Sequence, residues 1–362
     1  MLVYLIFLGG LAVVTGGAEL FVRNSSVLAR RLGISPLVIG LTLVAMGTSA
    51  PELAVSLKGV YSGATDIAVG NIVGSNIFNV LFILGVSALI IPLSVHLQIL
   101  RLDVPVMILA SMLLWVLAWD GKLVFAEGLL FVLIFVSYTV FIIYQSKKEK
   151  KEDAADYDKE FSKVSSSALK DWVLCPLMII LGLVLLVLGA RWMVSAAIEL
   201  ARGWGVSESV IGLTIVAAGT SLPEVATSIV AAIKGERDIA VGNIVGSNIF
   251  NILGILGICS LAAPAQGLVI SQGMLNFDIP VMVAVAFACL PIFLTSTRID
   301  RWEGGLFLFY YVAYTSYLVM QSMQHEQLPL LSSALLYFAV PITVVTLFVA
   351  FFRDSKSKVK AV

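Results

Sequence analysis

The sequence has few charged residues, two histidines and three cysteines. Only 13% of its 362 residues are Asp, Glu, Lys or Arg, and the formal net charge is zero, so we expect no nucleic-acid partner. His96 and His325 lie outside the long apolar runs, which disfavours a zinc or copper site and an intramembrane metallohydrolase. Cys175, Cys259 and Cys289 fall in apolar runs without a CxxC spacing, so we interpret them as small buried side chains.

Long apolar runs dominate the rest of the chain. Hydrophobic residues make up 59% of it and the mean hydropathy is +1.01, which excludes an ordinary soluble domain. A helix needs about 20 apolar residues to cross the hydrocarbon core of a bilayer. We predict an all-α membrane protein with spans at 2–22, 35–57, 67–93, 102–119, 123–145, 172–201, 207–233, 239–264, 277–297, 303–323 and 329–352.

Basic residues are distributed unevenly among the predicted loops. If the first span is retained and the N-terminus lies outside, 19 basic residues face the cytoplasm and 4 face the other side. This bias follows the positive-inside rule. We therefore predict a multi-pass protein of the cell membrane, with its N-terminus outside and its charged central loop in the cytoplasm.

An internal repeat organises the chain. Residues 38–85 align without a gap to residues 210–257 at an offset of 172, and 33 of the 48 aligned positions are identical. Both copies contain the run DIAVGNIVGSNIFN, and weaker similarity extends outward to give about five spans per copy. Because five is odd, two copies joined in series run in opposite directions through the bilayer. Such inverted repeats are typical of secondary transporters, whose site lies at the repeat interface near the midplane.

The repeat also predicts the domain boundaries. The first five-span repeat covers 1–145 and the second covers 172–323, which gives ten core transmembrane helices. A charged linker at 146–171 joins them, and 324–362 adds an eleventh span and a basic tail. The linker has no EF-hand spacing, so we interpret it as a cytoplasmic tether.

Each copy places a glutamate beside a helix-breaking proline, in GTSAPE at 47–52 and GTSLPE at 219–224. Proline lacks an N–H and so frees a carbonyl, which is costly inside a membrane unless it lines a cavity or meets a ligand. Hydroxyls and carboxylates spaced three or four residues apart lie on one helical face beside these carbonyls. The candidates are Thr48, Ser49 and Glu52 in the first copy and Thr220, Ser221 and Glu224 in the second.

The next span of each copy adds a polar stripe with a four-residue spacing. The stripe contains Asn71, Ser75 and Asn79 in the first copy and Asn243, Ser247 and Asn251 in the second. Glycine pairs beside the stripes allow the helices to pack closely. We expect ion binding at Ser75, Asn79, Ser247 and Asn251. Binding and interhelical hydrogen bonding fit equally well at Asn71, Asn76, Asn243 and Asn248, whereas helix capping is the interpretation for Asp66 and Asp238.

Carboxylates, hydroxyls, amide oxygens and carbonyls are hard ligands, which suit Ca²⁺ and Na⁺. One Ca²⁺ or two Na⁺ would balance the charge of two ionised glutamates. Exchange of one Ca²⁺ for three Na⁺ would therefore move net charge across the membrane. The residues permit this stoichiometry without requiring it.

The paired motifs resemble the two alpha repeats of the sodium/calcium exchangers, in the cation/calcium antiporter superfamily, and the similarity extends to about residue 323. The resemblance implies ten core helices in two inverted halves, a central site for Ca²⁺ or several Na⁺, and alternating access by sliding of the first and sixth helices. It implies that ten side chains bind the ions, namely Thr48, Ser49, Glu52, Ser75, Asn79, Thr220, Ser221, Glu224, Ser247 and Asn251. It also implies that the backbone carbonyls of Ala45 and Ala217 serve outer Na⁺ positions. Some members have an acid where this chain has Asn251, so here both halves end in an amide. The central loop of about 26 residues indicates a compact, prokaryote-like member.

The sequence thus predicts a transporter rather than an enzyme, namely a secondary active, electrogenic antiporter that exchanges Na⁺ for Ca²⁺. No prosthetic group is expected, and the partners are the transported ions and the lipid bilayer. A Ca²⁺/H⁺ exchanger and a K⁺-dependent Na⁺/Ca²⁺ exchanger remain alternatives. A passive cation channel is disfavoured, because inverted symmetry within one chain does not build a ring of groups around a pore. The oligomeric state stays open.

Overall fold

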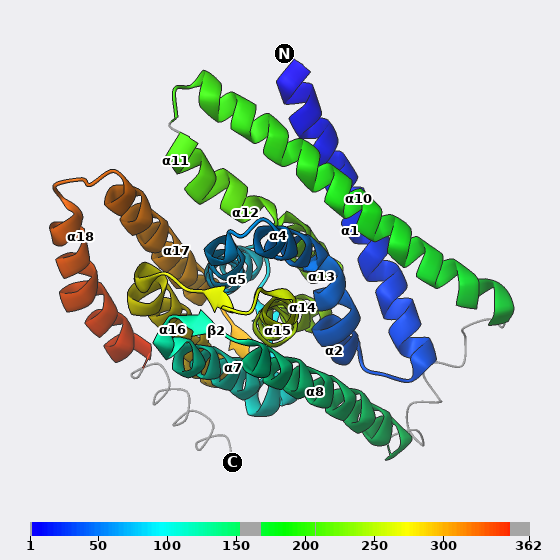
Figure 1. Ribbon diagram of the computed structural model, residues 1–362. Coiled ribbons are helices and arrows are strands. Elements are labelled where there is room, and N and C mark those ends of the chain that lie inside the picture. Colours follow the sequence, from blue (N-terminus) through cyan, green and yellow to red (C-terminus); the bar gives the residue numbers. More distant parts are fainter. Residues whose placement is uncertain (1, 153–167, 207, 348–362) are drawn as a thin grey trace.

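The computed structural model describes residues 2–152, 168–206 and 208–347, and nearly all of them are helical (Figure 1). This confirms the predicted all-α class. The first half contains α1 (Leu2–Leu32), α2 (Pro36–Ile39), η1 (Gly40–Val44), α3 (Ala45–Thr48), α4 (Ala50–Tyr61), α5 (Thr65–Phe78), η2 (Asn79–Leu84), α6 (Gly85–Ile90), β1 (Leu93–Ser94), η3 (Ile99–Asp103), α7 (Val104–Leu117), η4 (Ala118–Asp120), β2 (Lys122–Leu123) and α8 (Phe125–Glu152).

The second half repeats this order of elements. It contains α10 (Ala168–Gly203), α11 (Glu208–Ile211), η5 (Gly212–Val216), α12 (Ala217–Gly219), α13 (Leu222–Ile233), α14 (Arg237–Ile249), η6 (Phe250–Leu256), α15 (Gly257–Ala262), β3 (Leu268–Val269), η7 (Met274–Asp278), α16 (Ile279–Ser296), β4 (Arg298–Ile299) and α17 (Arg301–Ser322), followed by α18 (Leu328–Ala334) and η8 (Leu335–Ala339). Most of the predicted linker and the basic tail lie outside the described residues.

Two short antiparallel ladders join the halves. β1 pairs with β4, and β2 pairs with β3, so each ladder takes one strand from each repeat. The first strand of either repeat therefore pairs with the second strand of the other. This reciprocal pairing is what a two-fold relation between the repeats produces.

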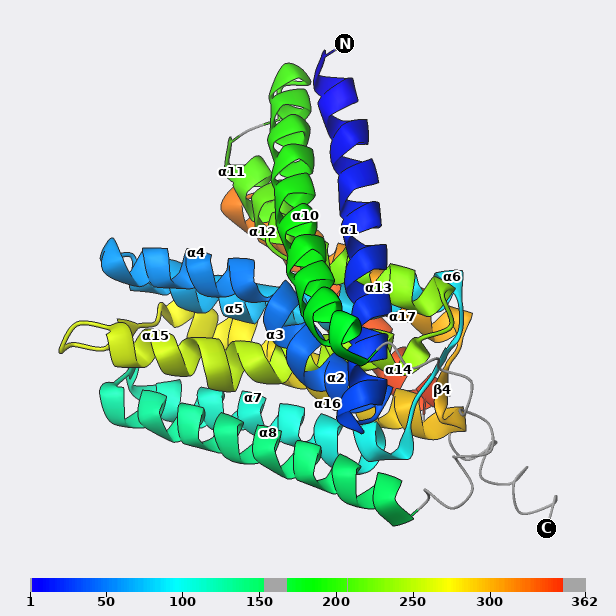
Figure 2. The ribbon, with the colours of Figure 1, turned by 90° about the vertical axis from the view of Figure 1, so that its right-hand side faces the viewer.

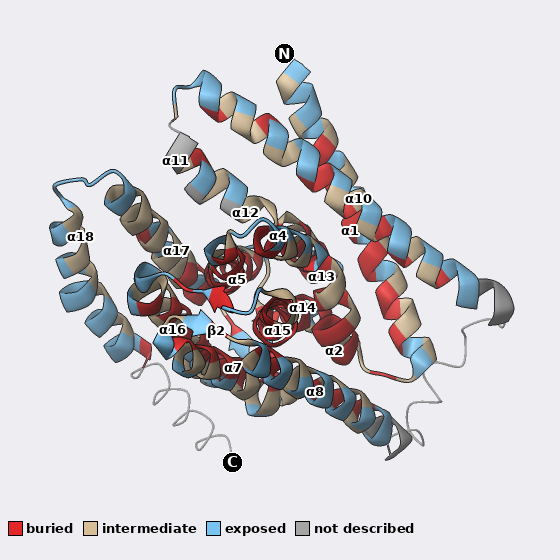
Figure 3. Cartoon of the chain, in the orientation of Figure 1, coloured by how far each residue is buried: buried red, intermediate tan, exposed pale blue. Residues whose placement is uncertain are grey.

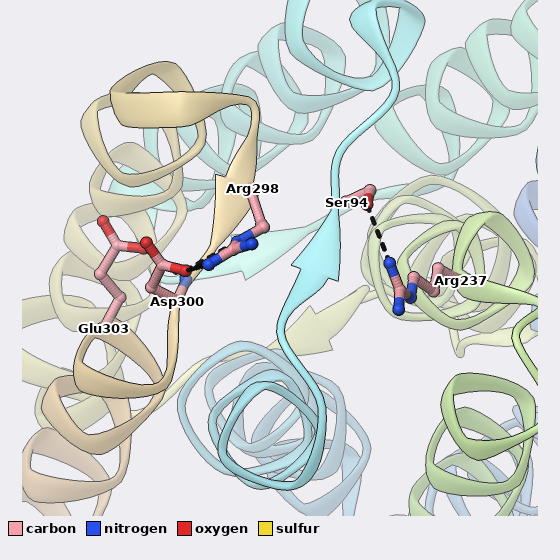
Figure 4. Close-up of polar contacts among 5 residues, drawn as sticks. All are labelled: Ser94, Arg237, Arg298, Asp300 and Glu303. Carbon is pink, nitrogen blue, oxygen red and sulfur yellow. Dashed lines mark hydrogen bonds and ion pairs between the residues drawn. The ribbon is translucent and has the colours of Figure 1, made fainter. Parts of the chain in front are cut away.

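The end of the molecule at the β1–β4 ladder carries several arginines (Figure 4). Arg237 Nη1 donates to Ser94 Oγ at 3.4 Å, so the start of α14 is tied to β1. Arg298 Nε donates to Asp300 Oδ1 at 2.7 Å, and Asp300 and Glu303 form a capping box at the start of α17. The positive-inside count assigns these arginines to the cytoplasmic side, and that orientation stays a prediction.

The long helices α1 and α10 pack against each other (Figures 1 and 2). Glycines form their contact: a Cβ atom added to Gly17 would lie 2.9 Å from the Gly182 carbonyl oxygen, and one added to Gly182 would lie 2.9 Å from that of Gly17. Small residues allow such close backbone approach between membrane helices. The two helices therefore form one tightly packed pair.

Fewer helices than predicted qualify as membrane spans among the described residues. Among the described residues, eight helices are long and apolar enough to cross a membrane, or nine if the bent pair Pro36–Thr48 and Ala50–Tyr61 is one span. The predicted number of ten core spans is therefore not confirmed. The predicted spans at 207–233 and 303–323 fall outside this set, the first because it is interrupted and the second because α17 is rich in tyrosine and glycine. The C-terminal helix Leu328–Leu347 is apolar, as expected for an eleventh span.

Burial is greatest in the two polar helices at the centre (Figure 3). In Thr65–Ile90 and Arg237–Ala262, 78% and 89% of the apolar window is buried, against 33% in α1 and 6% in the C-terminal helix. A helix that carries asparagine and serine is costly next to lipid, so the rest of the protein covers it. The three cysteines are buried and unpaired, which confirms their interpretation as small buried side chains.

Candidate cation site

The first broken helix changes direction at Ser49. α3 ends at Thr48 and α4 begins at Ala50, and the two parts of the span differ in direction by 45°. Pro51 is the second residue of α4, where the missing N–H has no intrahelical partner to lose. Glu52 follows in the first turn, where the helix dipole favours a negative charge.

The second broken helix reproduces this geometry. Ser221 has φ −89° and ψ 9°, close to the φ −82° and ψ 10° of Ser49, and α13 begins directly after it. Pro223 and Glu224 occupy the positions in α13 that Pro51 and Glu52 occupy in α4. The same local sequence therefore aims one glutamate inward from each repeat.

The glutamates bind the serines of the opposite repeat. Ser221 Oγ donates to Glu52 Oε1 at 2.7 Å, and Ser49 Oγ donates to Glu224 Oε1 at 2.8 Å. Both glutamates are 1% exposed. The structure thus brings the two carboxylates together at the repeat interface, each held by the other half of the chain.

The polar helices cross the broken helices through a second reciprocal set of bonds. Thr48 Oγ1 lies 3.1 Å from Asn243 Oδ1, and Thr220 Oγ1 lies 3.5 Å from Asn71 Oδ1. In both cases the threonine hydroxyl donates to the asparagine of the other repeat. Ser75 Oγ lies 3.2 Å from Ser221 Oγ, which connects the first polar stripe to the second broken helix.

Asn71 and Asn243 also anchor their own repeats. Asn71 Nδ2 donates to Ser56 Oγ, and Asn243 Nδ2 donates to Ser228 Oγ, each at 3.0 Å. Both asparagines thus make interhelical hydrogen bonds, one of the two interpretations that their spacing allowed. No role was predicted from the sequence for Ser56 and Ser228, although these serines occupy the same position in the two aligned copies.

The helices change to π-helical turns where the last stripe residues lie. Asn79 begins η2 and Asn251 is the second residue of η6. Such turns inside α-helices are frequent at functional sites. Asn79 Nδ2 donates to Asn248 Oδ1 at 3.1 Å, and Asn251 Nδ2 donates to Asn76 Oδ1 at 2.9 Å. The side-chain oxygens of Asn79 and Asn251 stay free of these bonds.

Five oxygens of the predicted ligands are buried without a hydrogen-bond partner in the described structure. They are Glu52 Oε2, Glu224 Oε2, Asn79 Oδ1, Asn251 Oδ1 and Ser247 Oγ. Burying an oxygen without a partner costs free energy, and an ionised carboxylate costs more than a neutral group. All five are hard oxygen ligands of the kind that Ca²⁺ and Na⁺ take. These unpartnered oxygens make the repeat interface a candidate cation site.

The two alanines lie directly before the breaks. The Ala45 carbonyl accepts the Ser49 N–H at 3.0 Å, so it is engaged within its own helix. Ala217 is the first residue of α12, directly after η5. Binding of outer Na⁺ by these carbonyls stays a prediction.

The capping interpretation holds in part: neither Asp66 nor Asp238 is an N-cap residue, but Asp66 Oδ1 accepts the backbone N–H of Ile67 at 3.0 Å. Ala64 and Glu236 occupy the N-cap positions of α5 and α14, and neither of these two residues makes a side-chain cap hydrogen bond. Both aspartates lie within the first turn, where they face the positive end of the helix dipole.

A cavity of about 550 Å³ reaches the candidate site. Asp66, Ile67, Gly74, Ser75 and Thr220 line it, together with parts of η5, η7 and α17. Ile67 is 55% exposed, whereas Ser75 is 2% exposed, so the cavity leads from the surface to a predicted ligand.

The equivalent space in the other repeat is closed by close backbone packing. A Cβ atom on Gly246 would lie 2.5 Å from the Leu41 carbonyl oxygen, whereas one on Gly74, its counterpart, would meet nothing within 4 Å. Val44 in η1 is fully buried, and its counterpart Val216 in η5 is 46% exposed. η1 thus closes on α14, while η5 stands away from α5.

Comparison with known proteins gives a consistent result. The family model described as sodium/calcium exchanger protein matches residues 2–144 and 174–320. The chain is 40% identical over 328 residues to a putative antiporter, CaxA, of Alkalimonas amylolytica, covering 89% of this chain and 100% of that protein. It is 35% identical to the sodium/calcium exchanger MaX1 of Methanosarcina acetivorans, covering 86% and 97%.

A solved structure shares the fold. The sodium-calcium exchanger NCX_Mj, in a crystal soaked with zero Na⁺ and Ca²⁺, superposes with a TM-score of 0.73 at 30% sequence identity. The match covers 88% of this chain and 99% of that one. These relatives are transporters rather than enzymes. The chain belongs to the sodium/calcium exchanger protein family.

Proposed function

We propose that the chain is a secondary active antiporter that exchanges Na⁺ for Ca²⁺ by alternating access. The observation that carries this proposal is the pair of buried glutamates, each of which keeps one oxygen without a hydrogen-bond partner. The proposed ligands are Glu52, Glu224, Thr48, Ser49, Ser75, Asn79, Thr220, Ser221, Ser247 and Asn251, with the carbonyls of Ala45 and Ala217. Solved structures of the relative NCX_Mj come from crystals that were soaked with Na⁺ together with Ca²⁺ or Sr²⁺. This supports Na⁺ and Ca²⁺ as the substrates of the present chain.

Charge balance supports electrogenic exchange. Two ionised glutamates are neutralised by one Ca²⁺ or by two Na⁺, and a third Na⁺ on hydroxyl and carbonyl oxygens adds a net positive charge. Moving one charge through a potential of 100 mV is worth about 2.3 kcal/mol. Exchange of three Na⁺ for one Ca²⁺ therefore responds to the membrane potential.

The unequal surroundings of the two repeats support alternating access. Two aligned sequences that share 33 of 48 positions adopt an open contact between η5 and α5 and a closed contact between η1 and α14. Exchanging these two contacts would close the present cavity and open an equivalent one at the other end. On the positive-inside count, the present cavity opens to the outside and the arginines near β1 and β4 lie in the cytoplasm.

The direct test is transport by the purified protein in liposomes. With Na⁺ inside, Ca²⁺ outside, and the proton gradient collapsed by an ionophore, we expect Ca²⁺ to accumulate without added K⁺. An inside-positive potential should accelerate uptake, because net positive charge leaves with three Na⁺. Uptake measured with radioactive Ca²⁺ checks both expectations.

The same assay separates the alternatives. Uptake that needs a proton gradient but no Na⁺ would identify a Ca²⁺/H⁺ exchanger. Uptake that needs K⁺ together with Na⁺ would identify a K⁺-dependent exchanger. Flux that ignores the Na⁺ gradient and exceeds carrier rates would identify a channel and overturn the proposal.

A further inference from the structure

Two buried methionines contact asparagine amides beside the cation site. Asn248 Nδ2 lies 3.4 Å from Met107 Sδ, and Asn76 Nδ2 lies 3.6 Å from Met282 Sδ. Met107 is in α7 and Met282 is in α16, and their exposed fractions are 1% and 2%. A polar amide that points at a thioether in a core needs an explanation, because methionine is usually a flexible packing residue.

Each methionine begins a chain of hydrogen bonds that ends at a proposed ligand. From Met107, the Asn248 amide donates to sulfur, Asn248 Oδ1 accepts from Asn79 Nδ2 at 3.1 Å, and Asn79 Oδ1 has no partner. From Met282, the Asn76 amide donates to sulfur, and Asn76 Oδ1 accepts from Asn251 Nδ2 at 2.9 Å. Asn251 Oδ1 likewise has no partner. The two chains are related by the same two-fold symmetry as the rest of the site.

The methionine sulfur determines the orientation of the side-chain amides of Asn248 and Asn76. A carboxamide has one accepting and one donating end of nearly the same shape, so reversing it changes packing very little. A thioether sulfur accepts a hydrogen bond and cannot donate one. The NH₂ group of the bridging asparagine therefore faces sulfur, its oxygen faces the next amide, and that amide must offer its own NH₂ group. Only the oxygen of the last asparagine is then left for a cation.

We propose that Met107 and Met282 are positioning residues that keep the side-chain oxygens of Asn79 and Asn251 directed at the transported cation. This inference rests on the proposed function. The methionines do not touch the cation and act through Asn248 and Asn76. An asparagine turned the other way would present its NH₂ group, whose partial positive charge repels a cation.

Each of these hydrogen-bond chains alternates between the two repeats. Met107 belongs to the first repeat, its bridging residue Asn248 to the second, and the oriented ligand Asn79 to the first again. Asn251 lies three residues after Asn248 on the same helix, yet it is oriented by Met282 through Asn76. If Met107 acts through hydrogen bonds, its substitution should therefore affect Asn79. If it acts only by packing against the helix of Asn248, its substitution should affect Asn251.

The first test replaces sulfur by carbon in a side chain of similar volume. We expect Met107→Leu to weaken Ca²⁺ binding about three- to tenfold, the loss of one hydrogen bond. Met282→Leu should have a smaller effect, because Asn76 Nδ2 also has the Asn248 backbone oxygen at 3.3 Å. Met112→Leu is the matched control, because Met112 is also in α7 but is 39% exposed. The Ca²⁺ affinity of this variant should equal that of the wild type. Equilibrium binding of radioactive Ca²⁺ to the purified full chain in Na⁺-free buffer measures these affinities.

The second test distinguishes orientation from packing by double-mutant cycles. Once Asn79→Ala removes the oriented oxygen, adding Met107→Leu should cause no further loss of Ca²⁺ affinity, whereas with Asn251→Ala the two losses should multiply. Met282→Leu should show the reverse pattern. If Met107 only packs against the helix of Asn248, its coupling should be to Asn251, which would overturn the proposal.

The wild-type measurement separates failure of this inference from failure of the proposed function. A wild-type protein that binds neither Ca²⁺ nor Na⁺ overturns the proposed function and the role of the methionines with it. A wild-type protein that binds Ca²⁺, with Met107→Leu and Met282→Leu variants that bind it equally well, overturns the methionine proposal alone. Thermal unfolding of each variant confirms that affinities are compared between folded proteins.

Discussion

Glu52→Gln and Glu224→Gln are each expected to abolish Na⁺-driven Ca²⁺ uptake. Glutamine keeps the shape and can still accept the serine hydroxyl that each carboxylate accepts at 2.7 Å or 2.8 Å, so the variants should fold. The substitution removes a negative charge from a buried position. At about 4 Å and an effective dielectric constant of about 20, one pair of unit charges interacts by roughly 4 kcal/mol. Ca²⁺ affinity should therefore fall by at least about a hundredfold.

Radioactive Ca²⁺ uptake into proteoliposomes measures this loss, with Glu326→Gln as the control. Glu326 is exposed in the loop between α17 and α18, so neutralising it should leave uptake unchanged. Monodisperse elution of the purified variants shows that they are folded. Wild-type uptake by a folded Glu52→Gln or Glu224→Gln variant would contradict the assignment of the carboxylates to the cation site.

Gly74→Ala is expected to stop transport while leaving Ca²⁺ binding intact. In the present state, a Cβ atom at Gly74 meets nothing within 4 Å. In the opposite state, η5 should approach α5 as η1 now approaches α14, where the Cβ of residue 246 would lie 2.5 Å from a carbonyl oxygen. Overpacking of this kind costs about 1–3 kcal/mol, which shifts the equilibrium between the states about 5- to 150-fold. The protein should then stay open on one side.

Gly246→Ala is the matched variant and should act in the opposite direction, because its Cβ clashes in the present state. A cysteine at Val216 reports the state, since Val216 is 46% exposed and lines the cavity. The three native cysteines are buried and should not react with a maleimide. We expect Gly74→Ala to keep the label rate high in Na⁺ and in Ca²⁺, and Gly246→Ala to lower it. Wild-type transport and labelling in both variants would show that the two states do not exchange these contacts.

The repeats made much of the site predictable. A gapless repeat with a proline, a glutamate and a four-residue polar spacing was enough to indicate which residues converge, and the structure places Glu52 and Glu224 at one interface. The partners were not predictable. Nothing in either copy indicates that Ser49 binds the glutamate of the other half, because crosswise contacts depend on how the helices cross.

Other features could not be read from the sequence for specific physical reasons. Two nearly identical copies cannot show that one contact is open and the other closed, since that difference belongs to the conformational state. Met107 and Met282 occur in similar segments of the two repeats, but an apolar side chain in an apolar span gives no sign of a polar contact. The count of spans was uncertain because hydropathy is low in an interrupted helix and in one rich in tyrosine.

The β1–β4 and β2–β3 ladders limit how this molecule can move. α7 separates β1 from β2, so the halves are fastened together at both ends of that helix rather than hinged at one. Such a frame resists rocking of one half against the other, because any tilt would break one ladder. The moving part must then be smaller than a repeat. We expect the glycine-packed pair α1 and α10, which contributes no strand to either ladder, to be the part that shifts along the rest of the protein.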